Sequence, residues 1–521
     1  MANESHSSQF GSGFDDSKDR RIVIISGIIC LVAILVLQSW TKPDPLAGIP
    51  TIGRGGSLIR KIQYFWDAKG MYLEGYRKYG NGVFRIPGSG ATDNIVLAPK
   101  FLEEVKRLPE DVLDATEANF ERLQGRYLTP DKDMTHMPGY VRSWITPALA
   151  RMRSEIEDEV KNALLQEIPQ SSEWTEINLC QKTPRIIAMV TGRIIVGLDL
   201  CRSATYIEIA TDFTKEVMAA AISITLIPWF LRPLIAPILP QLWLARRRIV
   251  QAEEVLGPTI TSRWLQPENL TRREQVDMLQ LMIEASKNCG RGKNDLVMEL
   301  LFLNIGAVHS TAMTITHALY WLVAKPDLID IMRKDVLQAL ATSDGEFSKL
   351  SLQQMTKLDS FLKEVLRCSN MVSATIHRKV TKPFTLSNGQ VIPSGVTIEI
   401  PSICVSSDAG NFTDPDEFDA LRFYNIAQQY QDEKTGSYGP ITNTEFSAAE
   451  SRTLSFGYGR HACPGRFLAS AEIKMILGNI LTEYEIKLPA GVFGRYKNLS
   501  FGPYSFPNPW KKILIRKLKE G

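Results

Sequence analysis

The residues best suited to chemistry lie in one short stretch, Phe456-Gly457-Tyr458-Gly459-Arg460-His461-Ala462-Cys463-Pro464-Gly465-Arg466-Phe467. Apolar residues recur at helical spacing downstream of it, so we expect Cys463 at the N-terminus of a helix. Backbone N–H groups and the positive end of the helix dipole favour a thiolate at that position. Gly457, Gly459 and Gly465 have no Cβ atom, which lets the backbone approach a large flat group.

Three kinds of site are compatible with this stretch. A stabilised thiolate beside a flat partner indicates haem, with Cys463 as the axial ligand of the iron. A buried and unreactive cysteine in a glycine-rich turn is the simplest alternative, because free cysteine is among the most buried residue types. A nucleophilic cysteine paired with His461 is the third. Residues elsewhere in the chain are needed to distinguish these three kinds of site.

The stretch resembles the haem-binding loop of the cytochrome P-450 family, in which the pattern is Phe-x-x-Gly-x-Arg-x-Cys-x-Gly. Phe456, Gly459, Cys463 and Gly465 match this pattern, and His461 stands where the family usually has arginine. The resemblance implies that Cys463 is the thiolate ligand of a haem iron and that the glycine-rich loop holds the haem.

A second cluster, Gly306-Ala307-Val308-His309-Ser310-Thr311, lies in a long helix expected from Asn294 or Asp295 to Ala324. The small residues Gly306 and Ala307 would let a planar group approach the helix. A helix crossing built from small residues is the alternative. The cluster is similar to the family's oxygen-activating motif, with His309 for the usual acid, Ser310 for the first threonine, and Thr311 retained. The resemblance implies that these three residues form the catalytic site and that the two hydroxyls deliver protons.

Two arginines and a glutamate are candidates for an ionic network that stabilises the fold. Glu364 and Arg367 lie at positions i and i+3 and therefore on one face of a helix, where a surface ion pair is the ordinary explanation. They also resemble the family's Glu-x-x-Arg element. Residues 418–423 match its Phe-x-Pro-x-Arg-Phe segment, except for Ala420 in place of proline. The resemblance implies a Glu364–Arg367–Arg422 network that holds the cysteine loop.

The carboxylate groups of haem need cations beside them. Arg378 and Arg142 match family positions that supply such cations, and His461 would be the third. Each arginine taken alone is equally compatible with an exposed surface residue.

Composition excludes several classes of protein. A chain of 521 residues that is 44% hydrophobic is not disordered throughout. A formal net charge of +3 is too small for a nucleic-acid-binding protein, which needs a clustered basic surface. The seven cysteines are scattered without paired metal-ligand spacing, which indicates a reducing compartment and neither a disulfide framework nor a zinc site.

The pattern of polar and apolar residues divides the chain into four parts. Residues 1–21 form a polar, disordered tail, residues 22–40 a transmembrane anchor, residues 41–55 a Pro- and Gly-rich hinge, and residues 56–521 the haem-thiolate monooxygenase domain. A cleavable signal peptide is the alternative for the second part, but no small-x-small site follows it. Lys18, Arg20 and Arg21 would place the N-terminus in the cytoplasm. The resemblance to microsomal members implies the reverse, with the large domain cytosolic.

These patterns predict a mainly α fold with a small β portion. Strands are expected over residues 83–86, 94–97, 391–400 and 513–515, and the proline-rich apolar segment 218–244 should contain two helix ends. The family resemblance implies a single-domain, membrane-anchored monooxygenase of the endoplasmic reticulum that receives electrons from NADPH through a reductase. It further implies a lipophilic substrate, with a fungal terpenoid (diterpene) first and a sterol or fatty acid next. A reductase-independent haem-thiolate isomerase or dehydratase and a non-catalytic haem-binding membrane protein are the alternatives.

Overall fold

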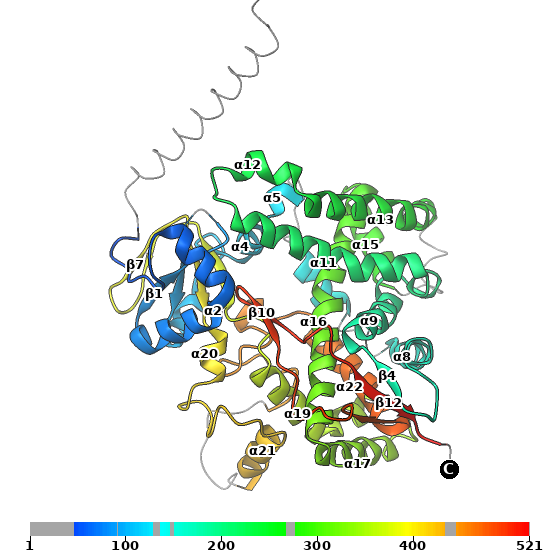
Figure 1. Cartoon of the computed structure of the whole chain (residues 1–521). Helices are drawn as coiled ribbons and strands as arrows, with labels where there is room; N and C mark the ends of the chain where they lie inside the picture. The colour runs from blue at the N-terminus through cyan, green and yellow to red at the C-terminus, as the bar shows by residue number, and fades with distance from the viewer. Residues whose placement is uncertain are drawn as a thin grey trace, which may run out of the picture.

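The computed structural model describes residues 46–90, 92–128, 136–145, 149, 151–266, 277–432 and 444–519. The predicted tail and anchor, residues 1–21 and 22–40, lie outside the described residues, as does the first part of the hinge. The described chain forms a large helical part and a smaller part built around a β-sheet (Figure 1).

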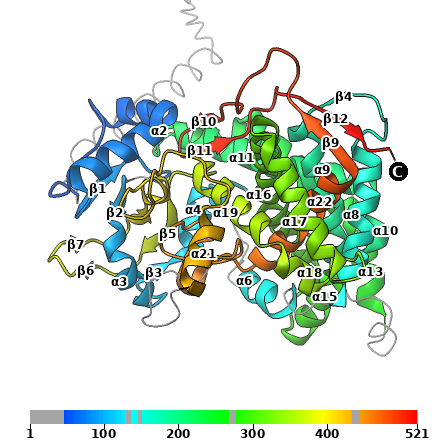
Figure 2. The same ribbon diagram turned by 90° about the horizontal axis from the view of Figure 1, so that it is seen from below.

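The long helix α16 (Leu296–Ala324) runs through the middle of the helical part (Figure 2). It is apolar nearly all round, so neighbouring helices must cover it on several sides. Among the described residues it is the helix whose length and composition would suit a membrane span, but 56% of its most apolar window is buried inside the protein. Burial of this kind is typical of a core helix. The helices packed against it are α9 (Leu179–Ile195), α11 (Ala204–Leu226), α13 (Pro240–Leu265), α19 (Thr356–Cys368) and α22 (Arg466–Glu483).

The remaining longer helices complete the shell around this core. They are α2 (Ser57–Tyr79), α4 (Ala115–Arg122), α8 (Arg153–Glu167), α15 (Met278–Asn288), α17 (Asp327–Ala341) and α21 (Arg422–Asp432). Short helices include α3 (Leu102–Arg107), α6 (Met137–Tyr140) with the π-helix Val141–Ile145 after it, α12 (Arg232–Ile235), α18 (Lys349–Gln354) and α20 (Ser402–Ser406). Helices α11 and α13 run side by side across α16, and α12 lies in the connection between them (Figure 1).

Two segments far apart in the sequence, residues 83–114 and 375–400, form the main sheet, in the order β1-β2-β8-β5-β3. Its members are β1 (Val83–Ile86), β2 (Asn94–Leu97), β3 (Leu113–Asp114), β5 (Thr375–Val380) and β8 (Thr397–Ile400). Strands β1 and β2 are antiparallel, whereas β2 and β8 are parallel, with Ile95 opposite Ile398. A three-stranded sheet, β4 (Thr175–Ile177), β12 (Ile513–Lys517) and β9 (Tyr484–Lys487), joins the C-terminal segment to the helical part. Two hairpins remain, β6 (Phe384–Thr385) with β7 (Val391–Ile392), and β10 (Leu499–Phe501) with β11 (Tyr504–Phe506).

The sequence patterns predicted most of this architecture. Strands β1 and β2 have the predicted bounds, and segment 218–244 contains the end of α11 and the start of α13, as expected. The strand predicted over 391–400 is instead two strands, because the chain turns between them at Gly395, whose φ of +83° favours glycine. Strand β4 was not predicted, because three residues are too few to show an alternating pattern.

Candidate active site

The cysteine loop is held by its own backbone. The Cys463 N–H donates a hydrogen bond to the Phe456 carbonyl oxygen at 2.8 Å, which closes the loop. Gly457 and Gly459 both have a φ of +70°, so these two positions need glycine for backbone conformation. Helix α22 begins just after the loop, with Gly465 as its N-cap residue. Cys463 therefore lies at the entrance of the helix, as its sequence position predicted.

Two opposing influences act on the Cys463 thiol. Burial is the larger one and raises its pKa, whereas the backbone N–H groups of Gly465 and Arg466 and the Arg466 guanidinium lower it. The N–H groups act in the predicted direction, but desolvation outweighs them. A metal cation at the sulfur would reverse this balance, because a coordinating thiol loses its proton.

Cys463 faces a cavity of about 660 Å³ that separates it from α16. Phe456, Cys463 and Gly465 line it on the side of the loop, and on α16 it is lined by residues that include Gly306. A Cβ atom added at Gly306 or Gly465 would meet no atom within 4 Å, so the backbone at both positions is bare toward open space. Most of the other lining side chains are apolar, among them Phe213, Val217, Phe302 and Leu468. The cavity therefore suits a flat group with an apolar molecule above it.

Four of the five residues predicted for the site on α16 line this cavity. Ala307, Ser310 and Thr311 line it together with Gly306. The Ser310 hydroxyl donates a hydrogen bond to the Gly306 carbonyl oxygen at 3.0 Å, within α16. The hydroxyl oxygen of Ser310 can still accept a hydrogen bond from another donor. Thr311 is buried at the wall of the cavity.

His309 does not belong to this group. It is not among the residues that line the cavity, and its Nε2 lies 2.7 Å from the Thr211 carbonyl oxygen of α11. Burial lowers the pKa of His309, so the neutral ring donates to that carbonyl. This contact ties α16 to α11, and a catalytic role for His309 stays a prediction. Sequence position alone could not show this, because consecutive helical residues point in different directions.

Cations gather at one edge of the cysteine loop. Arg142 Nη2 donates to the Arg460 carbonyl oxygen at 2.6 Å, and Arg378, Arg460 and His461 line one small cavity beside the loop. Burial lowers the pKa of Arg378 to about 10, with a further contribution from Arg460. Burial and then Arg378 lower the pKa of His461 to about 4, although Glu110 lies 3.3 Å from its ring. Positive groups that lower one another's pKa are suited to binding an anion.

The structure thus brings together the three residues that the sequence predicted for the haem carboxylates and adds Arg460. His461, with a pKa of about 4, is neutral at pH 7 and can contribute only a hydrogen bond. Nothing in the spacing of Arg460 distinguished it from an exposed arginine, although its position next to His461 was a signal that could have been used. A flat macrocycle with an iron at its centre and carboxylates at one edge fits these residues. Cys463 lines the catalytic cavity, the backbone at Gly306 and Gly465 is bare toward it, and Arg378, Arg460 and His461 line a smaller cavity beside the cysteine loop.

Glu364, Arg367 and Arg422 form a buried ionic network. Arg367 donates twice to Glu364, at 2.7 and 2.8 Å, and Arg422 Nε lies 3.2 Å from the same carboxylate. The three residues are 0%, 2% and 8% exposed, so this is not the surface pair that the spacing alone would suggest. Burial of three charges is tolerable because every one is hydrogen-bonded. The remaining guanidinium N–H groups donate to the carbonyl oxygens of Ser406, Thr413, Asp414, Pro415 and Glu417.

Short links connect this network to the cysteine loop. The Ser406 hydroxyl, whose carbonyl accepts from Arg367, donates to the Thr453 carbonyl oxygen at 3.4 Å. Lys363, the neighbour of Glu364 on α19, pairs with Glu450 at 2.8 Å. Both contacts reach the segment that leads directly into Phe456. The network therefore fixes the segment from which the loop starts.

Glu472 on α22 is a buried acid at the cavity, and no pattern in the sequence singled it out. It is 1% exposed, lines the cavity, and accepts a hydrogen bond from the Thr191 hydroxyl at 2.8 Å. Burial raises its pKa from 4.5 to about 8, against a smaller lowering by Thr191. The carboxyl is therefore protonated in the folded protein at neutral pH.

This raised pKa predicts a pH-dependent stability. The unfolded chain ionises Glu472 from about pH 4.5 upward, while the folded chain holds the proton to about pH 8. The free energy of unfolding should therefore fall as pH rises through this window, by at most about 1.4 kcal/mol per pH unit for one proton. Glu472→Gln cannot ionise, so it should gain stability relative to the wild type between these pH values, as measured by denaturant unfolding. Glu173→Gln, at an exposed glutamate, is the control, and an equal pH dependence in all three proteins would contradict the expectation.

A mainly helical fold, a cysteine that lines an apolar cavity and basic residues beside the cysteine loop are the features of a haem-thiolate protein. The family model for cytochrome P450 matches residues 138–500. The chain is 37% identical over 436 residues to the cytochrome P450 monooxygenase ATR3 of Stachybotrys chlorohalonatus, covering 83% of this chain and 90% of that protein. It is 30% identical over 491 residues to the cytochrome P450 monooxygenase braC of Annulohypoxylon truncatum, covering 93% and 96%. The ent-kaurene oxidase P450-4 of Gibberella fujikuroi is 29% identical over 505 residues, covering 94% and 95%.

The chain belongs to the cytochrome P450 family. It is a haem-thiolate monooxygenase whose electrons come from NADPH through a reductase, and it is similar to fungal members, one of which is named for the oxidation of a terpenoid.

Proposed function

We propose that this monooxygenase inserts one oxygen atom of O2 into a lipophilic terpenoid, most suitably a diterpene, in secondary metabolism. The observation that carries the proposal is the apolar cavity of about 660 Å³ between Cys463 and α16. Its walls can bury a hydrocarbon scaffold and keep water from the reacting carbon. The similarity to an ent-kaurene oxidase supports a terpenoid over a sterol or fatty acid, which are the next candidates.

The site residues have different roles. Bound haem supplies an iron centre for oxygen chemistry, made electron-rich by its thiolate ligand. Cys463 holds that iron, while Arg142, Arg378 and His461, with Arg460, hold the carboxylates of the macrocycle. Phe456, Gly457, Gly459 and Gly465 shape one side of the haem site, and Gly306 and Ala307 the other. Glu364, Arg367 and Arg422 have a structural role.

Ser310 and Thr311 are the groups placed to pass protons into the cavity. In Ser310→Ala with Thr311→Val, both hydroxyls are lost while the volume of the wall is nearly kept. We expect product formed per NADPH consumed to fall at least roughly tenfold, because general acid catalysis at a fixed position is removed. NADPH oxidation and product are measured together in reductase-containing membranes.

The matched control for this prediction is His309→Gln. It changes a neighbour on the same helix that donates to the Thr211 carbonyl and does not line the cavity. It should leave the ratio of product to NADPH unchanged. Equal ratios in all three proteins would mean that ordered water suffices and that the hydroxyls have no role.

Membrane attachment is the second part of the proposal, with residues 22–40 as a single-pass anchor in the endoplasmic reticulum, residues 41–55 as the hinge and the catalytic domain in the cytosol. Large apolar side chains are exposed on two elements that lie on the same side of the protein, α2 and the region of α12 (Figure 1). They are Leu58, Ile59, Ile62, Trp66, Leu234, Ile238 and Trp243. Such a patch suits contact with a bilayer.

Deletion of residues 2–40 should move the protein from carbonate-washed membranes toward the soluble fraction. Unchanged membrane retention would exclude residues 22–40 as the sole anchor.

The substrate is tested by expressing the chain with a P450 reductase and supplying cyclic diterpenes, sterols and fatty acids in parallel. New oxygenated terpenoids that require O2 and NADPH are the expected products. Oxidation of the sterols or fatty acids with no turnover of terpenoids would replace the proposed substrate class.

A further inference from the structure

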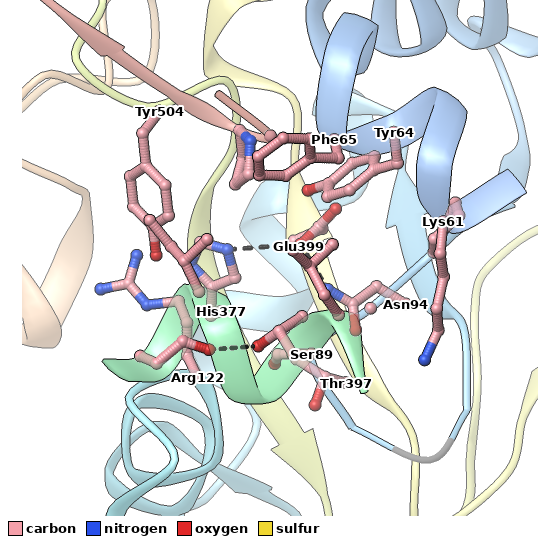
Figure 3. A pocket seen from close by; sticks show the side chains of 18 of the residues that line it. Lys61, Tyr64, Phe65, Ser89, Asn94, Arg122, His377, Thr397, Glu399 and Tyr504 are labelled. Atoms are coloured by element: carbon pink, nitrogen blue, oxygen red, sulfur yellow. Dashed lines mark hydrogen bonds and ion pairs between the residues drawn. The ribbon is translucent and has the colours of Figure 1, made fainter. Parts of the chain in front are cut away.

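A second pocket, of about 90 Å³, shares helices α4 and α11 with the catalytic cavity but none of its lining residues. It is formed by α2, the turn after β1, the end of α4, the end of α11 and the β10–β11 hairpin, and is shown in Figure 3. Its volume is about that of three water molecules, so it suits a small group at the end of a larger molecule. Unlike the catalytic cavity, it is bordered by several charged and polar side chains, including Lys61, Arg122, His377 and Glu399.

The carboxylate of this pocket is already occupied by protein donors. Glu399 is 1% exposed and accepts from the Tyr72 hydroxyl at 2.5 Å and from Asn94 Nδ2 at 2.8 Å. His377 Nε2 lies 3.3 Å from the same carboxylate, and burial lowers the pKa of that histidine. Three donors on two oxygens leave Glu399 little capacity for a further partner.

Arg122 and Lys61 are the two cations of this pocket, and neither forms an ion pair among the described residues; Arg122 is the one with a buried polar atom left without a partner. Its side chain stands at the wall of the pocket across from Lys61 and Asn94, near His377 and Tyr504 (Figure 3). Its Nε is buried, and within the part of the chain that the structure describes it has no hydrogen-bond partner. The guanidinium likewise forms none of the ion pairs found among the described residues. An unpaired cation that is partly withdrawn from water is costly, and a carboxylate is the partner whose geometry matches the guanidinium fork.

One face of α11 borders both the catalytic cavity and this pocket. Phe213 and Val217 line the cavity, and Ala221 and Thr225 line the pocket. The four residues follow one another at intervals of four, so they lie in one row along the helix. From Val217 to Thr225 the row extends about 12 Å at 1.5 Å per residue. The end of helix α4 also borders both spaces, with Phe120 at the catalytic cavity and Arg122 at the pocket.

We propose that the substrate carries a carboxylate, which Arg122 binds in this pocket while the hydrocarbon scaffold extends along α11 into the catalytic cavity. The proposal rests on the oxidation of a lipophilic substrate proposed above and narrows its class to a terpenoid acid. Arg122 is thus a specificity-determining residue remote from the reacting carbon. The enzyme then acts after a reaction that has already oxidised another carbon of the scaffold to the acid.

The test compares a diterpene acid with its own methyl ester. Abietic acid and methyl abietate share one scaffold and differ in the charge that Arg122 would bind. Their dissociation constants are measured by equilibrium dialysis with the full-length holoprotein, for the wild type, Arg122→Leu, Arg122→Lys and the control Arg126→Leu. Arg126 is an exposed arginine four residues away that does not line the pocket.

We expect the wild type and Arg126→Leu to bind the acid at least roughly tenfold more tightly than the ester, as a charge-assisted pair allows. Arg122→Leu should lose this preference, and Arg122→Lys should keep part of it. Equal affinity for acid and ester in the wild type, or a preference that survives in Arg122→Leu, would overturn the proposal. So would failure of the wild type to bind either compound. Terpenoid oxidation itself is tested separately by product formation, so an enzyme that oxidises neutral diterpenes and ignores the acid would disprove only the role of Arg122.

Discussion

Cys463→Ala is expected to abolish the thiolate-type Soret band in the carbon monoxide difference spectrum of the reduced protein, and to abolish product formation with it. Alanine removes the sulfur that faces the cavity and leaves the backbone bond to Phe456 possible. No other cysteine lines the catalytic cavity among the described residues, so none can substitute. This is the largest effect we expect of any single substitution, because the ligand determines the reactivity of the iron.

The control for this experiment is Cys289→Ala, which removes an exposed cysteine. It should keep a normal spectrum and normal turnover. A thiolate-type band that persists in Cys463→Ala would disprove the ligand assignment. Haem content is measured at the same time, so that loss of the ligand can be distinguished from loss of the protein.

The second large effect is expected for Arg367→Met. Methionine keeps much of the side-chain volume but leaves the Glu364 carboxylate buried with one of its two arginine partners removed. Breaking a buried ion pair from one side costs about 3–5 kcal/mol. We therefore expect a large loss of stability in thermal unfolding, together with a low haem-to-protein ratio, because the network fixes the segment leading to the cysteine loop.

Arg367→Lys and Lys512→Met separate the possible explanations. Lysine restores the charge without the fork that makes two bonds, so it should recover only part of the stability. Lys512 pairs with Glu176 at the surface, where an ion pair contributes little, so its loss should not be measurable. Unfolding of Arg367→Met at the wild-type temperature, with full haem content, would show that the network is dispensable.

The fold was predictable where one element carries a long pattern. Helix α16 follows from its apolar run and its Lys325-Pro326 end, and β1 and β2 follow from their alternation around a turn. Short strands such as β4 were not predictable, because their pairing with β12 arises from tertiary contacts more than three hundred residues apart in sequence. Propensity has little influence on an element of three residues.

The candidate site shows the same division. Cys463, Ser310, Thr311 and the Glu364 network could be proposed from spacing and family resemblance, because each lies in a local motif. The direction of His309, the burial that raises the pKa of Cys463 and Glu472, and the unpaired state of Arg122 depend on what other segments place against these residues. Spacing along a helix gives the face of a residue, but desolvation and pairing require the neighbours.

The main sheet also determines when this protein can fold during synthesis. Its central parallel pair joins β2 to β8, and the Tyr72 hydroxyl reaches Glu399 across 327 residues of sequence. At about 5–20 residues per second, roughly 15–60 s pass on the ribosome between the two halves of this pairing. Over that interval β1 and β2 have an unpaired edge, and the apolar side chains of α2 lack their sheet. The main sheet therefore cannot be completed until residue 400 has been synthesised.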